Sequence, residues 1–226
     1  MHIAGFPINA AILISLFTMI ICQILSVHRS FGYEIRNNKI LDKRVQKFLE
    51  SRKGTWHDLN VPYDDGKVLY DLVLKNGYKK ALEIGTSTGL SAIWIALALS
   101  KTGGRLITIE SDKNRYKQAL SNFKEAGLSD YIDARLADAH ELVEKLQGPF
   151  SFVFSDADKE WYINYFKTLA PKLEVGGCFT AHNVRNTDME GTSEFIDYVK
   201  DLPNFKTTID TSSSEEISIS YKIAKG

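Results

Sequence analysis

Short apolar segments alternate with longer amphipathic segments along most of the chain. Apolar or β-branched runs occur at 80–84, 105–109, 131–135, 150–155 and 176–181, and a helix-length segment separates each from the next. Such alternation is typical of βαβ units, in which parallel strands form a sheet with helices on both faces. The pattern therefore predicts an α/β fold with a doubly wound, mostly parallel sheet.

Two amphipathic helices are predicted before the first of these strands. In "NNKILDKRVQKFLESRK" the apolar positions share one helical face, with charges on the other; they are Ile40, Leu41, Val45, Phe48 and Leu49. In "DDGKVLYDLVLKNG", Asp64 is a candidate cap at the start and Gly77 at the end. Both segments are expected to lie across the domain.

The end of the chain has a different pattern. Two strand-like runs, "FKTTID" and "EEISISYKI", are joined by the polar turn "TSSS" with no room for a crossover helix. Two strands joined by a short turn are antiparallel. We therefore expect a C-terminal antiparallel hairpin at a sheet edge.

The N-terminal segment 8–27 contains no charged residue and is followed by five basic residues, from Arg29 to Arg44. About 20 apolar residues suffice for a membrane-spanning helix. The basic residues after the segment favour a retained anchor with the following domain in the cytoplasm. The alternatives are export after cleavage of an atypical signal peptide, or a buried core helix. The expected division is residues 1–30 as the anchor or signal segment and residues 31–226 as one globular domain.

Composition narrows the class of protein. The chain has 226 residues, with 28 basic and 28 acidic side chains, so its charge does not favour a nucleic-acid partner. Its two cysteines, Cys22 and Cys178, are too few for a disulfide framework or a thiolate metal cluster. A small-molecule site on an α/β domain is the more natural expectation.

The first predicted strand leads into a turn that contains two glycines, "GTSTG" at 85–89. Turns at the carboxyl ends of strands bind ligands in open α/β sheets, and Glu110 ends the next strand where a ligand's ribose hydroxyls would lie. Glu83, just before the turn, suits a ligand with positive charge, such as a sulfonium with an ammonium group. The structural alternative is a glycine turn with a glutamate that only caps a helix.

These segments occur in an order that resembles a known family. "DDGKVLYDLV", "ALEIGTSTGLSAIWIALAL", "LITIESD" and "FSDADKEWYINYFKTLAPKLEVGGCF" are similar to motifs of class I S-adenosylmethionine-dependent O-methyltransferases of the catechol and caffeoyl-CoA branch. The resemblance runs from about Asp64 to the C-terminus. It implies a Rossmann-like, seven-stranded sheet whose last hairpin is antiparallel, and methyl transfer to a hydroxyl of a small, catechol-like aromatic acceptor.

The resemblance also implies a set of cofactor-binding residues for S-adenosylmethionine. They are Val61, Glu83, Gly85, Thr86, Ser87, Gly89, Ser91, Glu110, Asp138, Ala139 and Asp156. His140 is expected at a helix start beside the adenine. A loop with His57, flanked by Trp56 and Tyr63, is a candidate lid over the acceptor.

The candidate catalytic residues are Lys159, Asp156 and His182. Family members use a divalent cation, which lowers the pKa of the acceptor hydroxyl and fixes its angle of attack. Asp156 and Asp158 follow one strand and Asn183 the next, so Asp156, His182 and Asn183 are the candidate ligands. The family has Asp-Asn where this chain has His182-Asn183. Three possibilities follow: a histidine-containing site for a softer ion, a metal held by Asp156 and Asn183 with water, or a metal-free site with His182 as general base.

Two other classes of function are compatible with part of the pattern. A nucleotide-dependent oxidoreductase would use the glycine turn and Glu110 but not the Asp-Ala-Asp-Lys segment at 156–159. A non-catalytic S-adenosylmethionine-binding protein would explain the departure at His182. A homodimer is possible, as in many family members. The family's Gly-Asp-Gly in the final turn is absent, so no acceptor contact is expected from that motif.

Overall fold

The computed structural model describes residues 23, 38–56, 59–184, 191–212 and 215–225. The chain divides into two compact units, Met1–Lys43 and Arg44–Gly226. In the first unit, residues 23 and 38–43 are described and are helical. The second unit contains the sheet and the site discussed below.

The described strands form one seven-stranded sheet in the order β3-β2-β1-β4-β5-β7-β6. Their bounds are β1 Lys80–Ile84, β2 Arg105–Glu110, β3 Ile132–Leu136, β4 Phe150–Ser155, β5 Leu173–His182, β6 Phe205–Asp210 and β7 Ile217–Lys222. The first five are parallel, whereas β7 is antiparallel to both β5 and β6. The predicted α/β fold with a C-terminal antiparallel pair is confirmed.

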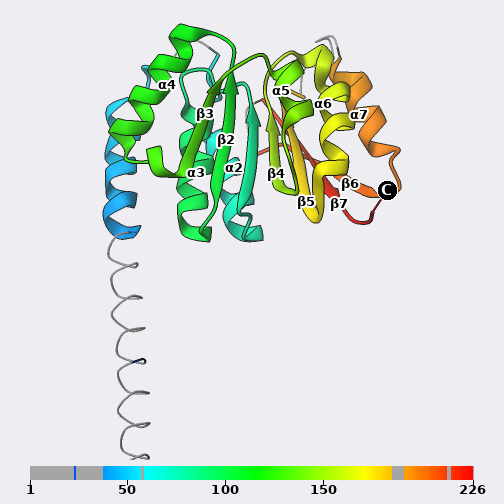
Figure 1. Ribbon diagram of the computed structural model, residues 1–226, viewed down its shortest axis with the longest axis horizontal. Helices are drawn as coiled ribbons and strands as arrows, with labels where there is room; N and C mark the ends of the chain where they lie inside the picture. Colours follow the sequence, from blue (N-terminus) through cyan, green and yellow to red (C-terminus); the bar gives the residue numbers. More distant parts are fainter. Residues whose placement is uncertain (1–22, 24–37, 57–58, 185–190, 213–214, 226) are drawn as a thin grey trace, which may run out of the picture. The chain divides into compact units, whose positions relative to one another are not determined.

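Helices cover both faces of this sheet (Figure 1). They are α2 Tyr63–Asn76, α3 Leu90–Thr102, α4 Lys113–Ala126, α5 Ala139–Lys145, α6 Tyr162–Leu169 and α7 Thr192–Lys200. Helix α2 packs against α3, and α6 packs against both α5 and α7. Each of the first five strands is joined to the next strand in the sequence by a crossover that contains a helix. The arrangement is therefore doubly wound, with helices on both faces of the sheet.

The core follows from the alternation of side chains along the strands. In β1, Leu82 and Ile84 belong to the cluster formed with Tyr162, Phe166 and Phe195 of α6 and α7. Successive strand residues point to opposite faces, so Ala81 and Glu83 face the other helical layer. All residues of β1 after Lys80 are buried. Glu83 is therefore a carboxyl group in an otherwise apolar strand.

The two helices predicted before β1 are present, with corrections at their ends. Residues 38–51 are helical, and Val45, Phe48 and Leu49 are buried, but Ile40 is 60% exposed. The prediction that Asp64 caps the second helix is wrong, because α2 begins after Pro62 and has no side-chain cap. Gly77 does end that helix, in the left-handed conformation at φ 67°.

The predicted membrane segment 8–27 lies outside the described residues apart from Gln23. Among the helices that the structure describes, none combines the length and apolar character needed to cross a bilayer. Cys178 is a buried free thiol in β5.

Candidate active site

A cavity of about 690 Å³ opens at the carboxyl ends of the parallel strands. It lies where the strand order reverses between β1 and β4, the position at which open α/β sheets bind ligands. Its lining includes Gly85 after β1, Glu110 at the end of β2, Asp156 after β4 and His182 at the end of β5. Residues far apart in the sequence thus meet around one space.

The turn after β1 allows close approach to the backbone. Gly85 and Gly89 have φ of 92° and 101°, where side chains other than glycine are strained. A Cβ atom on Gly85 would lie 2.7 Å from the carbonyl oxygen of Asp156, and one on Gly89 would lie 2.5 Å from the Phe123 ring. The glycines are therefore required both by conformation and by the packing of the turn against its neighbours.

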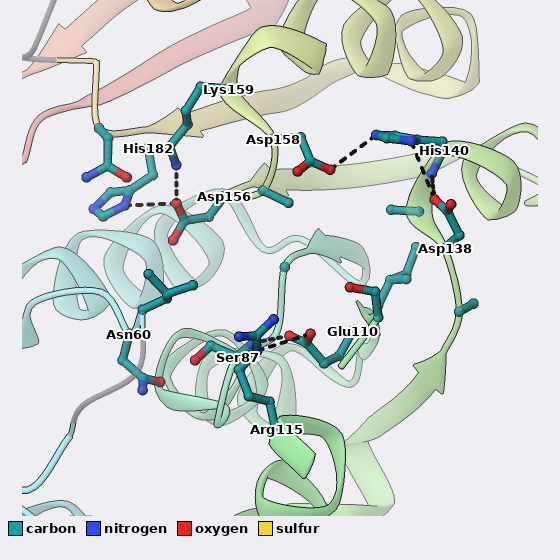
Figure 2. Close-up of a pocket in the computed structure, with 18 of the residues that line it drawn as sticks. Asn60, Ser87, Glu110, Arg115, Asp138, His140, Asp156, Asp158, Lys159 and His182 are labelled. Carbon is teal, nitrogen blue, oxygen red and sulfur yellow. Dashed lines mark hydrogen bonds and ion pairs between the residues drawn. The ribbon is translucent and has the colours of Figure 1, made fainter. Parts of the chain in front are cut away.

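Glu110 organises this turn from the adjacent strand. Its Oε2 accepts a hydrogen bond from the Ser87 amide at 2.7 Å, and its Oε1 accepts one from the Asp112 amide at 2.8 Å. Arg115 Nε lies 3.3 Å from the same Oε1. The carboxylate is only 5% exposed, yet it lines the cavity (Figure 2). It is placed to accept hydrogen bonds from ligand hydroxyl groups.

Glu83 lies beneath the turn and is absent from the cavity lining that the described residues form. It is fully buried and accepts a hydrogen bond from the Thr108 hydroxyl, which also bonds to Thr86. Burial raises the pKa of Glu83 to about 8, although hydrogen bonds from Ser91 and Thr108 oppose the shift. The premise that Glu83 brings a negative charge to the ligand is therefore not met at neutral pH in this structure.

A second wall of the cavity is formed by the start of α5. The Asp138 side chain accepts a hydrogen bond from the His140 amide at 2.8 Å and caps this helix. The His140 ring stacks on Trp161 with a centroid distance of 3.8 Å, and its Nε2 lies 3.1 Å from Asp158 Oδ2. His140 is thus at a helix start, as expected, and its ring joins α5 to the segment after β4.

The opposite wall carries Lys159 beside Asp156 (Figure 2). Lys159 Nζ donates to Asp156 Oδ1 at 2.6 Å and to the Tyr162 hydroxyl at 2.9 Å. Burial alone would raise the pKa of Asp156, but the charges and hydrogen bonds of His182 and Lys159 outweigh it and the net shift is downward. Asp156 is therefore an anion held between two cationic groups.

His182 is the most enclosed of the polar residues on this wall. It is 2% exposed, its Nε2 lies 2.7 Å from Asp65 Oδ2 and its Nδ1 lies 3.2 Å from Asp156 Oδ1. Burial lowers the pKa of His182, but the charge of Asp156 and the hydrogen bonds of Asp156 and Asp65 have the larger effect and raise it to about 9. The two aspartates therefore favour the protonated ring.

This geometry does not fit the family's divalent metal ion. A metal ligand or a general base needs a ring nitrogen with an available lone pair. In His182 both nitrogens face carboxylate oxygens, which only accept hydrogen bonds. Asp156 Oδ1 already accepts from Lys159 and His182. Neither the histidine-containing metal site nor the histidine base matches this arrangement.

The structure brings together nine of the fourteen residues that the sequence analysis proposed as catalytic, cofactor-binding or metal-binding. Those that line the cavity are Gly85, Ser87, Glu110, Asp138, Ala139, Asp156, Lys159, His182 and Asn183. Those that lie outside its lining are Val61, Glu83, Thr86, Gly89 and Ser91. Of the candidate lid, His57 lies outside the described residues, and Trp56 and Tyr63 pack against Phe48 and Trp94.

Several residues at the site were missed by the sequence analysis, and three of them make specific polar contacts there. Asn60 lines the cavity, donates to Thr88 Oγ1 at 2.7 Å and accepts from the Leu90 amide at the start of α3. Arg115 pairs with Glu110. Asp65, fully buried at the start of α2, holds His182. The pair of acids at 64–65 was a visible signal, but only Asp64 was given a role, as a cap.

A family comparison agrees with this site. Residues 34–192 match the model of an O-methyltransferase family, so the chain belongs to that family. It is 35% identical over 130 residues to caffeoyl-CoA O-methyltransferase 1 of Eucalyptus globulus, covering 55% of this chain and 52% of that protein. It is 38% identical over 130 residues to a catechol O-methyltransferase of Niastella koreensis, covering 56% and 58%. The match therefore spans little more than half the length of these curated relatives.

Solved structures resemble the chain over a larger share. An O-methyltransferase from Bacillus cereus in complex with SAH has a TM-score of 0.67 and 26% identity, covering 80% of this chain and 90% of that one. O-methyltransferase TomG from Streptomyces achromogenes, in complex with SAM, has a TM-score of 0.66 and 25% identity over the same shares. The structural likeness thus covers four-fifths of this chain, a larger share than these curated relatives cover.

Proposed function

We propose that this protein binds S-adenosylmethionine and transfers its methyl group to a hydroxyl of a small hydroxylated aromatic acceptor. The observation that carries the proposal is the cavity itself, which places Glu110 beside a glycine turn on one wall and Lys159 on the opposite wall. The first wall suits a nucleoside, and the second suits a developing oxyanion. Membership of the O-methyltransferase family supports the same assignment.

The cofactor would lie over the turn after β1. Glu110 offers carboxylate oxygens to the ribose hydroxyls, and Gly85 lets the ligand approach the backbone. Asp138, Ala139 and His140 would flank the adenine. Because Glu83 is buried beneath the turn, its part is to hold Thr108 and Thr86 in place rather than to pair with the cofactor's charge.

The acceptor would lie against Lys159. A phenolic hydroxyl has a pKa near 10, and an ammonium group next to its oxygen stabilises the oxyanion. Lys159 is paired with Asp156, so we assign it an electrostatic role and not that of a base. Relatives named for caffeoyl-CoA, catechol and flavonoid substrates support an aromatic acceptor with hydroxyl groups.

Methyl transfer would then proceed as an in-line displacement. The acceptor oxygen forms a bond to the methyl carbon while the bond from sulfur to that carbon breaks, and sulfur keeps the electron pair. The hydroxyl proton is released to solvent as Lys159 favours the oxyanion. The contribution of the protein is to align the three atoms and to exclude water from the methyl group.

The test is transfer of labelled methyl groups to a panel of catechols, single phenols and aliphatic diols, with production of S-adenosylhomocysteine followed in parallel. We expect label on catechols and little on aliphatic diols. Calorimetric titration with S-adenosylmethionine and with NAD decides between a methyl donor and a nicotinamide cofactor. Cofactor binding without transfer to any acceptor would favour the non-catalytic binding protein, and NAD binding would favour the oxidoreductase.

We also propose that the apolar segment 8–27 anchors the chain to a membrane, with the enzyme domain on the cytoplasmic side. The support is its sequence alone, which has no charged residue and is followed by basic ones. Fractionation of the full chain and of a chain that begins at Asn38 tests this. If both remain in the soluble fraction, or if protease added outside intact cells cleaves the domain, the proposal fails.

A further inference from the structure

We propose that the acceptor wall of this cavity works without a divalent metal ion, because His182, clamped between Asp65 and Asp156, closes the position that a metal would take. The inference rests on the proposed methyl transfer for its activity readout, but its central claim concerns metal binding alone. Of the three possibilities that the sequence leaves open, it excludes the two that contain a metal ion, and it differs from the third because His182 is not a base here.

The first argument is the orientation of the imidazole. Its Nε2 lies 2.7 Å from Asp65 Oδ2 and its Nδ1 lies 3.2 Å from Asp156 Oδ1. Each ring nitrogen is thus already within hydrogen-bond distance of a carboxylate oxygen, and neither is left open as a position for a metal ion. A carboxylate at position 182 would instead offer two oxygens.

The second argument is the state of Asp156, the remaining acid among the candidate ligands. Its Oδ1 accepts from Lys159 Nζ at 2.6 Å and from His182. Mg²⁺ or Mn²⁺ would have to enter beside two cationic groups already in contact with this carboxylate, and its charge would be repelled by both. Asn183 adds only a neutral oxygen, and hard cations bind most strongly where carboxylates accumulate.

The third argument is that the clamp is built into the fold. Asp65 is fully buried in the first turn of α2. The next residue, Gly66, is where this helix meets α3, because a Cβ atom there would lie 2.1 Å from Trp94 Cδ1. On the other side, the His182 carbonyl accepts a hydrogen bond from the Tyr162 hydroxyl at 3.0 Å. Rotating the ring away would leave Asp65 as a buried carboxylate without this partner, which is costly.

The cationic groups also supply what a metal would contribute. A divalent ion stabilises the oxyanion of the acceptor by its charge. Here Lys159 and His182 flank Asp156, and Lys159 and His182 both line the cavity. With Asp65 and Asp156 both counted, the four charges sum to zero, so the stabilisation would come from the position of the Lys159 ammonium next to the acceptor oxygen and not from a net positive charge of the wall. The acceptor hydroxyl would be stabilised by Lys159, while His182 keeps Asp156 oriented toward that lysine.

The experiment measures metal binding and activity separately. The full chain is treated with EDTA, desalted and titrated with Mn²⁺, with bound ion followed by electron paramagnetic resonance. Three proteins are compared: the wild type, His182→Asp, and His182→Asn as its uncharged match in size. We expect no stoichiometric site in the wild type or in His182→Asn, and binding at least about tenfold tighter in His182→Asp, because only that change adds a hard anionic ligand.

The activity readout is methyl transfer by the wild type with EDTA and with added Mg²⁺, Mn²⁺ or Zn²⁺. We expect rates that agree within about twofold, because no step depends on an ion. One Mn²⁺ bound per wild-type chain and lost in Asp156→Asn, or activity abolished by EDTA and restored by an ion, would overturn the inference. If no transfer occurs under any condition, the proposed function fails while the Mn²⁺ titration still decides this one. If His182→Asp does not fold, the wild type and Asp156→Asn suffice.

Discussion

The two walls of the cavity are built in different ways. The cofactor wall is made by a turn and the end of the neighbouring strand, where Glu110 accepts the amide hydrogens of Ser87 and Asp112. The acceptor wall is made by His182 at the end of β5 and by Asp156 and Lys159 after β4, and the buried Asp65 of α2 supports it by its ion pair with His182. Backbone groups dominate the first wall, and charged side chains dominate the second.

The two walls therefore differ in how readily amino-acid substitutions can alter them. A wall made of backbone amides tolerates few alterations, since its shape depends on turn conformation. The charge of a wall made of side chains, in contrast, can be changed by a single substitution. We infer that the departure at His182 changes the means of activating the acceptor and leaves the cofactor wall as it is.

The largest effect is expected from Lys159→Met. Methyl transfer should fall by roughly 10³-fold, because the oxyanion loses its charged partner, while the affinity for S-adenosylmethionine stays within about threefold. Labelled-methyl kinetics and calorimetry measure the two quantities. The matched control is Lys167→Met, an exposed lysine of α6. A loss of less than tenfold in Lys159→Met would place the activating group elsewhere.

The next largest effect is expected from Gly85→Ala, which alters the backbone of the turn after β1. The free energy of unfolding should fall by about 2–4 kcal/mol, from the left-handed strain and from overlap with the Asp156 carbonyl. Gly103→Ala is the control, because its φ of 72° gives the strain but no atom lies within 4 Å of its Cβ. Urea denaturation of both variants measures the difference. Equal losses would mean that close packing at Gly85 does not matter.

Glu110→Gln should act on binding rather than on chemistry. Loss of a charged acceptor costs about 1.5–3 kcal/mol, which corresponds to roughly 10- to 100-fold weaker binding of the cofactor. The exposed Glu144→Gln is the control for a general loss of negative charge. Calorimetric titration gives both dissociation constants. An unchanged affinity in Glu110→Gln would remove Glu110 from the cofactor wall.

The smallest effect concerns Glu83 and pH. Its folded pKa of about 8 lies above the ordinary 4.5, so the folded state keeps a proton that the unfolded state has released. Wild-type stability therefore falls as pH rises from about 4.5 to 8, and Glu83→Gln lacks this loss. Between pH 6 and 7 the stability of Glu83→Gln relative to wild type should rise by about 1 kcal/mol. Urea denaturation at both pH values checks this, and a constant difference would contradict the buried, protonated carboxyl.

The sequence was sufficient for the order of the elements and for the position of the glycine turn and Glu110 at the carboxyl ends of the strands. Strand-length apolar runs predict strands, and the glycines at 85 and 89 predict a turn with positive φ. Both predictions are possible because periodicity and φ preference depend only on residues close together in the sequence. The same holds for Glu110, which ends a strand and therefore lies at the carboxyl edge of the sheet. The C-terminal hairpin was predictable because its turn is short.

Only the tertiary structure decided the acceptor wall. Asp65 and His182 are 117 positions apart, yet their side chains meet at 2.7 Å because α2 packs on α3 beside the end of β5. Sequence patterns assigned Asp64 a capping role and left His182 with three possible roles. Whether the ring nitrogens of His182 already have partners depends on contacts between elements that are distant in the sequence. Other contacts of this long-range kind bury Glu83 and set the pKa of its carboxyl group. The chain therefore specifies locally where the cavity lies, and only through packing which charged groups line it.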